Sequence, residues 1–256
     1  MATRQTAERR QKIRRLILDG ALPPMGELAG RFGVSRETIR KDLLALEKDG
    51  LGRKGYGGTF IVEAVQERKL ALRLAENVDK KAAIARAALG HIPGGSTVLL
   101  DAGSTTLELA RLLKGVPDLH IVTNSATIPQ LLVDCPSTVS CLGGDLRKTS
   151  LAFTGPWTLA GIRSLRADVA FLGADALDAD GPCTSVVAEA EVKRAMAATA
   201  CQCVVLCDST KLSKRSGVPI CPWGDVDLLI TDGDIPDEDV KRLEQWVRVE
   251  AAKSGI

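Results

Sequence analysis

The sequence predicts an α/β protein of two domains, a small N-terminal helical domain with a β-hairpin and a larger domain built on a mainly parallel sheet. Three observations support this prediction. The 256 residues suffice for one core of about 150 to 200 residues and a second, smaller module. Lys and Arg are concentrated near the N-terminus. In the remainder, apolar runs that end in small or polar residues alternate with helical patterns, which indicates parallel strands covered by helices on both faces.

The formal net charge of +2 conceals an uneven distribution of charge. Residues 1–60 contain 13 Lys and Arg against 7 Asp and Glu, whereas the remaining residues contain 21 against 25. The first part is therefore strongly basic and the rest mildly acidic. This asymmetry favours a polyanionic partner for the N-terminal part alone.

The composition also excludes several classes of protein. No apolar run approaches the roughly 18 residues of a membrane span, and the N-terminus lacks the apolar stretch of a secretory signal, so we expect a soluble, cytoplasmic protein without membrane association. The seven cysteines form no CxxC pair and only two histidines are present. We therefore expect reduced, buried thiols, no metal site and no cofactor.

Two helices are expected at the start of the chain. Apolar residues recur at helical spacing in the first one, at Ile13, Leu16 and Ile17. After Pro23 and Pro24, a second and shorter helix begins near Met25. Its apolar stripe consists of Leu28, Ala29 and Phe32. Gly33 then supplies a turn with the dimensions of a helix-turn-helix motif.

A third helix follows this turn. Ser35 is expected to cap it by accepting a hydrogen bond from a backbone N–H, and Val34 and Ile39 can form a hydrophobic staple around the cap. Ile39, Leu43 and Leu46 point to the core, so the polar residues of the first two turns lie on the outer face. Those polar residues are Ser35, Arg36, Thr38, Arg40 and Lys41.

Hydroxyl and guanidinium groups at the start of such a helix can contact base edges and phosphates in a major groove. We therefore predict that these five residues bind double-stranded DNA. The alternative is a solvated helical face, which is the usual role of a run of charges. That alternative does not account for the order of short helix, glycine turn and capped helix.

The segment LGRKGYGGTFIV predicts a two-stranded hairpin with a glycine-rich turn. In such a wing, Arg53, Lys54 and Tyr56 reach the sugar-phosphate backbone or the minor groove, where contacts set the register of binding more than its sequence. The alternative is a glycine-rich hinge. The chain is thus expected to hold a winged helix-turn-helix domain over residues 1–62, a connecting helix over 63–80 and an α/β domain over 81–256.

Six apolar runs predict the strands of the larger domain, namely TVLLDAGSTT, HIVTNS, TVSCLGGD, DVAFLGAD, CVVLCDST and DLLITD. Open parallel sheets bind ligands beyond the carboxyl ends of their strands. Polar residues and glycines fall at those ends, and we expect one pocket to collect them. Together with two residues of a following helix, the predicted pocket residues are Asp101, Gly103, Ser104, Thr105, Thr106, Asn124, Gly143, Gly144, Asp175, Glu189, Lys193 and Lys211.

The run AGSTT is the predicted anion cradle. Gly103 permits close approach of the backbone, three hydroxyls follow it, and the next helix points its N–H groups at a ligand. No GK[ST] follows, so this is not a nucleotide P-loop. The alternative is that the hydroxyls cap a helix and the glycine only turns the chain.

Two further positions have alternatives of their own. Lys211, close to Asp208, can hold a phosphate or hydroxyl group, or it is an ordinary surface cation. Glu189, Glu191 and Lys193 lie on one amphipathic helix, where the alternative is a solvated face with a local ion pair.

As an ordered set, these stretches resemble the DeoR family of bacterial transcription regulators over nearly the whole chain. The resemblance is carried by ELAGRFGVSRETIRKDLLALEKDG, LDAGSTT, IVTNS, LGGDLR, FLGADALDADG, EAEVKRAM, DSTK and LLITD. It implies a winged helix-turn-helix followed by a sensor domain similar to ribose-5-phosphate isomerase. It also implies a repressor of a carbohydrate or polyol operon, with operator DNA as one partner and a phosphorylated sugar or polyol as effector.

The resemblance assigns the five helix residues to base and phosphate contacts and residues 103–106 to a phosphate cradle. Asn124, Gly144, Asp175 and Lys211 would surround the sugar. The chain departs from the family pattern at Tyr56, where the wing usually has a histidine. It lacks the glycine-rich lysine segment of the isomerases after GAD, so we expect no enzyme activity; the alternative is an active isomerase with a DNA-binding appendage. Paired recognition helices imply a homodimer or homotetramer.

Overall fold

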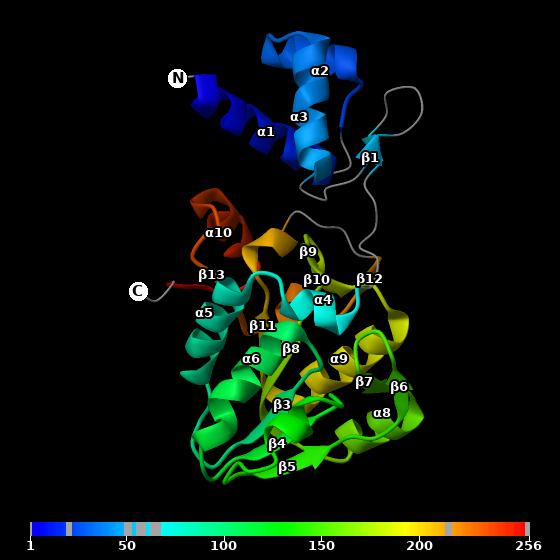
Figure 1. Ribbon diagram of the computed structural model, residues 1–256, viewed down its shortest axis with the longest axis vertical. Coiled ribbons are helices and arrows are strands. Elements are labelled where there is room, and N and C mark those ends of the chain that lie inside the picture. Colours follow the sequence, from blue (N-terminus) through cyan, green and yellow to red (C-terminus); the bar gives the residue numbers. More distant parts are fainter. Residues whose placement is uncertain are drawn as a thin grey trace. The chain divides into compact units, whose positions relative to one another are not determined.

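The computed structural model describes residues 2–18, 22–48, 53–54, 60–61, 68–212 and 217–253. They form two compact units, one comprising the described residues up to Ile61 and the other those from Arg68 onward (Figure 1). Each unit has its own hydrophobic core. The boundaries 1–62, 63–80 and 81–256 remain predictions.

The N-terminal unit is a helix-turn-helix with a hairpin, as predicted. Its elements are α1 (Ala2–Leu18), α2 (Met25–Phe32), α3 (Arg36–Lys48) and the antiparallel pair β1 (Arg53–Lys54) and β2 (Phe60–Ile61). Gly33 ends α2 in the left-handed conformation, with φ of 62°, which a residue without Cβ adopts readily. This sharp stop allows α3 to start only three residues later.

The three helices share one small core. Ile13, Leu28 and Ile39 are fully buried in it, and Val34 packs against the same cluster, in agreement with the predicted staple. A polar contact that the sequence did not indicate joins α1 to α3. The buried Asp42 carboxylate accepts from Arg9 Nε at 2.6 Å and from Arg10 Nε at 2.8 Å.

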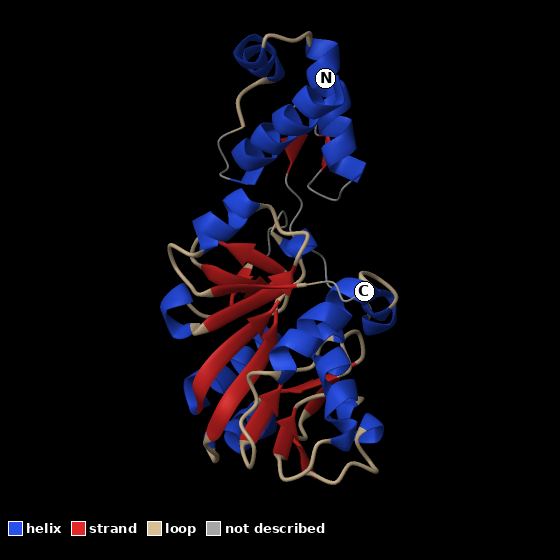
Figure 2. Cartoon of the chain, turned by 90° about the vertical axis from the view of Figure 1, so that its left-hand side faces the viewer, coloured by secondary structure: helices blue, strands red, loops and turns tan. Residues whose placement is uncertain are grey.

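The second unit is built on a seven-stranded sheet in the order β14-β13-β11-β8-β3-β4-β5, and every pairing in it is parallel (Figure 2). All six predicted strands are present. Their bounds are β3 (Thr97–Leu100), β4 (His120–Thr123), β5 (Thr138–Cys141), β8 (Ala167–Gly173), β11 (Ala200–Leu206) and β13 (Leu228–Asp232). The edge strand β14 (Val249–Ala252) was not predicted.

Helices cover both faces of this sheet. On one face α5 (Val78–Leu89), α6 (Ser104–Leu112) and α7 (Ile128–Leu131) form a core with Leu100 and the other strand residues of the same parity. On the other face α8 (Pro156–Arg163), α9 (Val187–Thr199) and α10 (Asp237–Leu243) pack with Leu99 and its neighbours. Period-two alternation along buried strands thus produces a three-layer domain. Cys203 and Cys207 are both buried in the second core, as expected, whereas Cys141 and Cys201 are exposed, so the expectation of buried thiols is wrong for those two.

Several short elements complete the second unit. They are the hairpin of β6 (Asp145–Arg147) and β7 (Ala152–Thr154), a small antiparallel sheet of β9 (Ala176–Asp178), β10 (Gly181–Thr184) and β12 (Val218–Pro219), and the 3-10 turns η2 (Leu113–Gly115), η3 (Ser209–Lys211) and η4 (Trp223–Asp225). None of these was predicted.

The expected connecting helix over 63–80 is not continuous in its described part. A short helix, α4 (Leu70–Leu74), is followed by a turn, and α5 begins at Val78. Asn77 in this turn has φ of 52°, a left-handed conformation that cannot continue a helix. No helix in the described ranges is both long and apolar enough to cross a membrane.

Candidate functional site

The start of α3 carries the predicted DNA contacts. Thr38 N donates to Ser35 Oγ at 3.1 Å, so Ser35 caps the helix as predicted, and the two hydroxyl oxygens lie 2.9 Å apart. Arg36 and Lys41 are exposed. These groups form one basic, solvent-facing surface at the helix N-terminus, opposite Ile39 and the core.

Arg40 is engaged within its own helix. Its Nε and Nη2 each donate to a carboxylate oxygen of Glu37 at 2.7 Å, and this hydrogen bond raises the pKa of the guanidinium. On binding DNA, the Arg40 guanidinium would leave the Glu37 carboxylate and contact a phosphate or a base instead. Arg53 and Lys54 lie on β1, whereas Tyr56 lies outside the described residues. The DNA contacts of all eight positions stay predictions.

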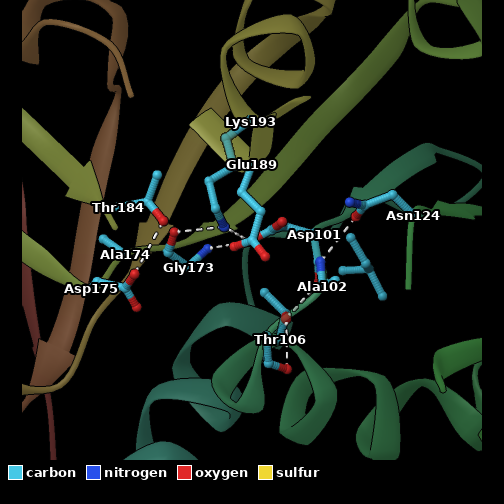
Figure 3. A network of polar contacts seen from close by, with 12 residues as sticks. Asp101, Ala102, Thr106, Asn124, Gly173, Ala174, Asp175, Thr184, Glu189 and Lys193 are labelled. Atoms are coloured by element: carbon cyan, nitrogen blue, oxygen red, sulfur yellow. Dashed lines mark hydrogen bonds and ion pairs between the residues drawn. The ribbon is translucent and has the colours of Figure 1, made fainter. Parts of the chain in front are cut away.

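Several of the predicted effector residues of the second unit lie at the boundary between β3 and β8. The chain runs outward from β3 through β4 to β5 and then returns to add β8 on the other side of β3. This is the topological switch point, where open α/β sheets bind ligands. Asp101 follows β3 directly, and its Oδ2 accepts from the N–H of Gly173 at the end of β8 at 3.1 Å (Figure 3).

Asp101 and Lys193 form a buried ion pair at this point. The Lys193 ammonium donates to Asp101 Oδ2 and, at 3.0 Å, to the Gly173 carbonyl. Burial raises the pKa of the Asp101 carboxyl, and the Lys193 charge offsets this only in part. Lys193 and Glu189 are both buried, so the expected alternative of a solvated helical face is wrong for them. They point from α9 toward the strand ends (Figure 3).

The N-terminus of α6 has the properties of an anion site. No side chain caps it, and the hydroxyls of Ser104 and Thr105 make no hydrogen bond to other described residues. Its first N–H groups therefore have no internal partner and carry partial positive charge. Thr106 differs, because its Oγ1 donates to the carbonyls of Asp101 at 2.6 Å and Gly103 at 3.1 Å and holds the turn together.

Asn124, like Thr106, forms hydrogen bonds to the backbone that stabilise the local structure. Its Oδ1 accepts from Ala102 N at 3.0 Å, and its Nδ2 donates to the Phe153 carbonyl at 3.0 Å. These bonds tie the ends of β3 and β4 to the β7 strand. The side chain is almost fully buried, so a sugar contact by Asn124 would use its remaining N–H or the second lone pair of Oδ1.

Gly143 and Gly144 belong to a neighbouring region, and an ion pair of Glu189 leads toward the β6 strand beside it. Thr158 Oγ1 donates to the Gly143 carbonyl at 2.8 Å, which fixes the end of β5 against α8. Glu189 accepts from Arg147 Nε on the β6 strand at 3.2 Å. Among the described residues, no hydrogen bond joins either glycine to the Asp101 and Lys193 pair, so a shared pocket remains a prediction for them.

Asp175 is held on the far side of β8. Its Oδ2 accepts from Thr184 Oγ1, Ser185 N and Ser185 Oγ at 2.8 to 3.1 Å. Burial alone would raise the pKa of Asp175, but the positive charge of Lys211, the Ser185 hydrogen bond and the charges of Lys193 and Arg73 outweigh it and lower the pKa. The charge of Lys211 thus acts on Asp175, and a pocket shared by the two stays a prediction.

The loop after β11 is attached to the start of α5. Asn77 Nδ2 donates to Asp208 Oδ1 at 3.2 Å and to Thr210 Oγ1 at 3.3 Å. Lys80 Nζ donates to Ser209 Oγ at 2.9 Å and to Asp232 Oδ1 at 2.8 Å. The polar residues of this loop therefore hold the turn between α4 and α5.

Sequence reasoning missed several charged residues of this region. Arg73 and Lys81 both lie close enough to Asp175 or Asp208 to affect the local charge, and Arg147 binds Glu189. The run LRLAENVDKK contains the first two, but its three cations are nearly balanced by two carboxylates, so charge alone was no clear signal. Among the described residues, no group of three His, Cys, Asp or Glu side chains can hold a metal ion.

Two family models match the chain. Residues 9–65 match the DeoR-like helix-turn-helix domain, and residues 76–233 match the DeoR C terminal sensor domain. The matches cover the recognition helix and the strand ends described above.

Full-length relatives are transcriptional regulators, not enzymes. The transcriptional regulator GlpR of Haloferax volcanii is 33% identical, with 93% of this chain and 94% of the relative covered. The transcriptional repressor AccR of Agrobacterium fabrum is 34% identical, with 91% and 92% covered. Among solved structures, ribose 5-phosphate isomerase A from Methanocaldococcus jannaschii is 19% identical over 54% of this chain and 55% of that chain, with a TM-score of 0.41.

Proposed function

The chain belongs to the DeoR family of transcriptional regulators, and from this premise we propose that it represses a carbohydrate or polyol operon and responds to a phosphorylated effector. The effector binds at the switch point of the second unit. The α3 surface binds operator DNA as part of a homodimer or homotetramer, with half-sites spaced by whole helical turns of roughly 34 Å.

One observation carries the effector part of the proposal. The N-terminus of α6 lacks a side-chain cap and presents two hydroxyls without partners among the described residues, at Ser104 and Thr105. A phosphate monoester supplies acceptor oxygens and negative charge for such a helix end. Lys211, on the loop after β11, provides a cation near the same strand ends.

The DNA part is supported by the cap and exposure of α3. Ser35 fixes the start of the helix, and Arg36 and Lys41 are exposed in its first two turns. Phosphate contacts by these cations would give the affinity, and contacts to base edges would give the sequence preference. Salt should therefore weaken binding steeply.

The proposal is tested by two binding measurements on the same variants. Operators are first selected from random double-stranded DNA with the purified protein. Fluorescence anisotropy then gives operator affinity, and a thermal-shift screen of sugar and polyol phosphates against their unphosphorylated counterparts identifies the effector, because a ligand selective for the native state raises Tm.

Two pairs of variants separate the functions. Arg36→Ala and Arg40→Ala should lose operator binding and keep the effector-dependent rise in Tm. Thr105→Val and Lys211→Ala should bind operator as the wild type does and show a smaller rise in Tm at the same effector concentration. Wild-type behaviour of either pair would refute the corresponding site, and a rise in Tm with the unphosphorylated compounds alone would refute the phosphorylated effector.

A further inference from the structure

Arg73 in α4 has a buried side-chain nitrogen, Nε, without a hydrogen-bond partner in the described part of the chain. Arg73 Nε and Ser150 Oγ are the two buried side-chain nitrogen or oxygen atoms in the described part of the chain that have no hydrogen-bond partner. Buried polar atoms in folded proteins nearly always have one, because an unmet donor loses its bonds to water without replacement. Each such atom in a native structure therefore requires a reason.

Both atoms flank the same junction. Leu70 N, at the start of α4, donates to the Thr149 carbonyl at 2.8 Å, so α4 is bound to the loop that carries Ser150. Arg73 lies three residues further along α4 and therefore on the same side of that helix. α4 also contacts α6, the helix whose N-terminus is uncapped. The unmet N–H thus lies in a helix that borders the proposed effector site.

Positive charge accumulates around this N–H. Lys81 is buried, and the partners of its ammonium in the described part of the chain are the backbone carbonyls of Arg73 and Glu76. Burial lowers the pKa of Lys81, and the nearby charges of Lys211 and Arg73 lower it further against the opposite effect of Asp208 and Glu76. Within the described ranges, no carboxylate forms an ion pair with Arg73, Lys81 or Lys211. Three neighbouring cations without a paired anion favour an anionic ligand.

We propose that Arg73 is a ligand-binding residue: its Nε–H, together with the ammonium groups of Lys81 and Lys211, holds the anionic group of the effector. This inference rests on the proposed function, because it names further residues of the same site. Lys81 retains one N–H after its two carbonyl bonds, and Lys211 retains all three. The three side chains come from α4, α5 and the turn η3 after β11.

The position of Arg73 in the chain gives this contact a regulatory consequence. α4 is the first described helix after the DNA-binding unit. A ligand that bridges Arg73 and Lys211 therefore connects the beginning of the second unit to the loop after β11. A ligand that contacts only the α6 N-terminus makes no such connection.

The test uses the full chain and inorganic phosphate as the probe. Tm is measured against phosphate concentration at constant ionic strength, with chloride as the replacing anion, for wild type, Arg73→Gln, Arg73→Lys and Lys211→Gln. Arg68→Gln is the matched control, because Arg68 is an exposed arginine of the same segment that pairs with Glu76. We expect phosphate affinity to fall roughly 10- to 100-fold in both Arg73 variants, the loss of one charge-assisted hydrogen bond, and to stay unchanged in the control.

Arg73→Lys keeps the positive charge but lacks the Nε–H donor. Weak phosphate binding by this variant would therefore show that the hydrogen bond is needed as well as the charge. If Arg73→Gln does not fold, Arg73→Lys alone provides the test. Weak binding in Lys211→Gln with wild-type affinity in both Arg73 variants would overturn the inference and leave the proposed function intact. In that case a water molecule satisfies Arg73 Nε. A wild-type Tm that does not respond to phosphate would overturn both this inference and the proposed phosphorylated effector.

Discussion

Gly143 and Gly144 follow β5 side by side, yet only the second has to be a glycine. Gly144 has φ of +151°, and a Cβ there would lie 2.2 Å from Thr158 Oγ1 and 2.4 Å from the Thr154 carbonyl oxygen. A Cβ on Gly143 would meet nothing within 4 Å. The two glycines of LGGD therefore have different physical roles, although the sequence treats them alike.

We predict that Gly144→Ala lowers the free energy of unfolding by about 2 to 4 kcal/mol, from backbone strain and the displacement of Thr158. Gly143→Ala should change it by less than about 1 kcal/mol. Urea denaturation followed by circular dichroism measures both values. Equal losses in the two variants would show that the conformation at Gly144 is not as described.

The hydroxyls of Thr105 and Thr106 are also adjacent and distinct. Thr106 Oγ1 bonds two backbone carbonyls, whereas Thr105 Oγ1 bonds none of the described residues. We predict that Thr106→Val lowers the free energy of unfolding by about 1 to 3 kcal/mol because two carbonyls lose a donor. Thr105→Val should leave it nearly unchanged and weaken effector binding about tenfold. Denaturation and calorimetric titration of both variants check this, and a reversed pattern would contradict the assignment.

At the scale of elements, α5 is fastened to the sheet by Lys80. Its ammonium donates to Asp232 at the end of β13 and pairs with Asp234 at 2.7 Å. Burial would raise the pKa of Asp232, but the hydrogen bonds from Lys80 and Ser209 outweigh it, and the pKa lies below its ordinary value of 3.8. The carboxylate form of Asp232 therefore stabilises the folded state.

We predict that Lys80→Met lowers the free energy of unfolding by about 1 to 3 kcal/mol at neutral pH. Because the folded pKa of Asp232 is depressed, its contribution is complete above the unfolded pKa and is lost as pH falls through the folded one. The difference between wild type and Lys80→Met should thus shrink below about pH 4. Denaturation at several pH values measures it, with Lys114→Met, an exposed lysine, as the control. A difference that grows in acid would contradict the sign.

In the N-terminal unit, ion pairs at the buried Asp42 join α1 to α3. Two arginines of α1 donate to its buried carboxylate, so Asp42→Asn leaves them with a neutral partner. We predict a loss of about 3 kcal/mol in the stability of this unit. The expected result is an earlier unfolding of the N-terminal unit, seen by hydrogen exchange in α1 and α3, with effector binding unchanged. A uniform change in exchange over both units would argue against a local role.

Element positions were predictable because local patterns determine them. The glycine at position 33, the serine cap and the apolar runs each act within a few residues, and the corresponding helices and strands are present. The short edge strand β14 and the two- to four-residue strands of the small sheet depend on distant partners and gave no such pattern. The contacts within the site were unpredictable for the same reason. Lys193 binds Asp101 although they are 92 positions apart in the sequence, and no local pattern indicates such a pair.

For the whole molecule, the proposed function requires that DNA and effector favour different arrangements of the protein. A coupling of about 1 to 3 kcal/mol between the two sites corresponds to a 5- to 150-fold change in operator affinity. An effector with equal affinity for both arrangements would change nothing, however tightly it bound. The change in operator affinity thus measures the difference between the effector's affinities for the two arrangements, and this relation can be tested quantitatively.

We predict that the coupling is reciprocal. If saturating effector weakens operator binding by some factor, saturating operator DNA must weaken effector binding by the same factor, because both measurements close one thermodynamic cycle. Anisotropy titrations of the operator with and without effector give the first factor, and calorimetric titrations of the effector with and without operator give the second. Arg36→Ala serves as the control, since its effector affinity should not respond to DNA. Factors that differ beyond error would mean that the effector acts on oligomeric state, whose own equilibrium then has to enter the cycle.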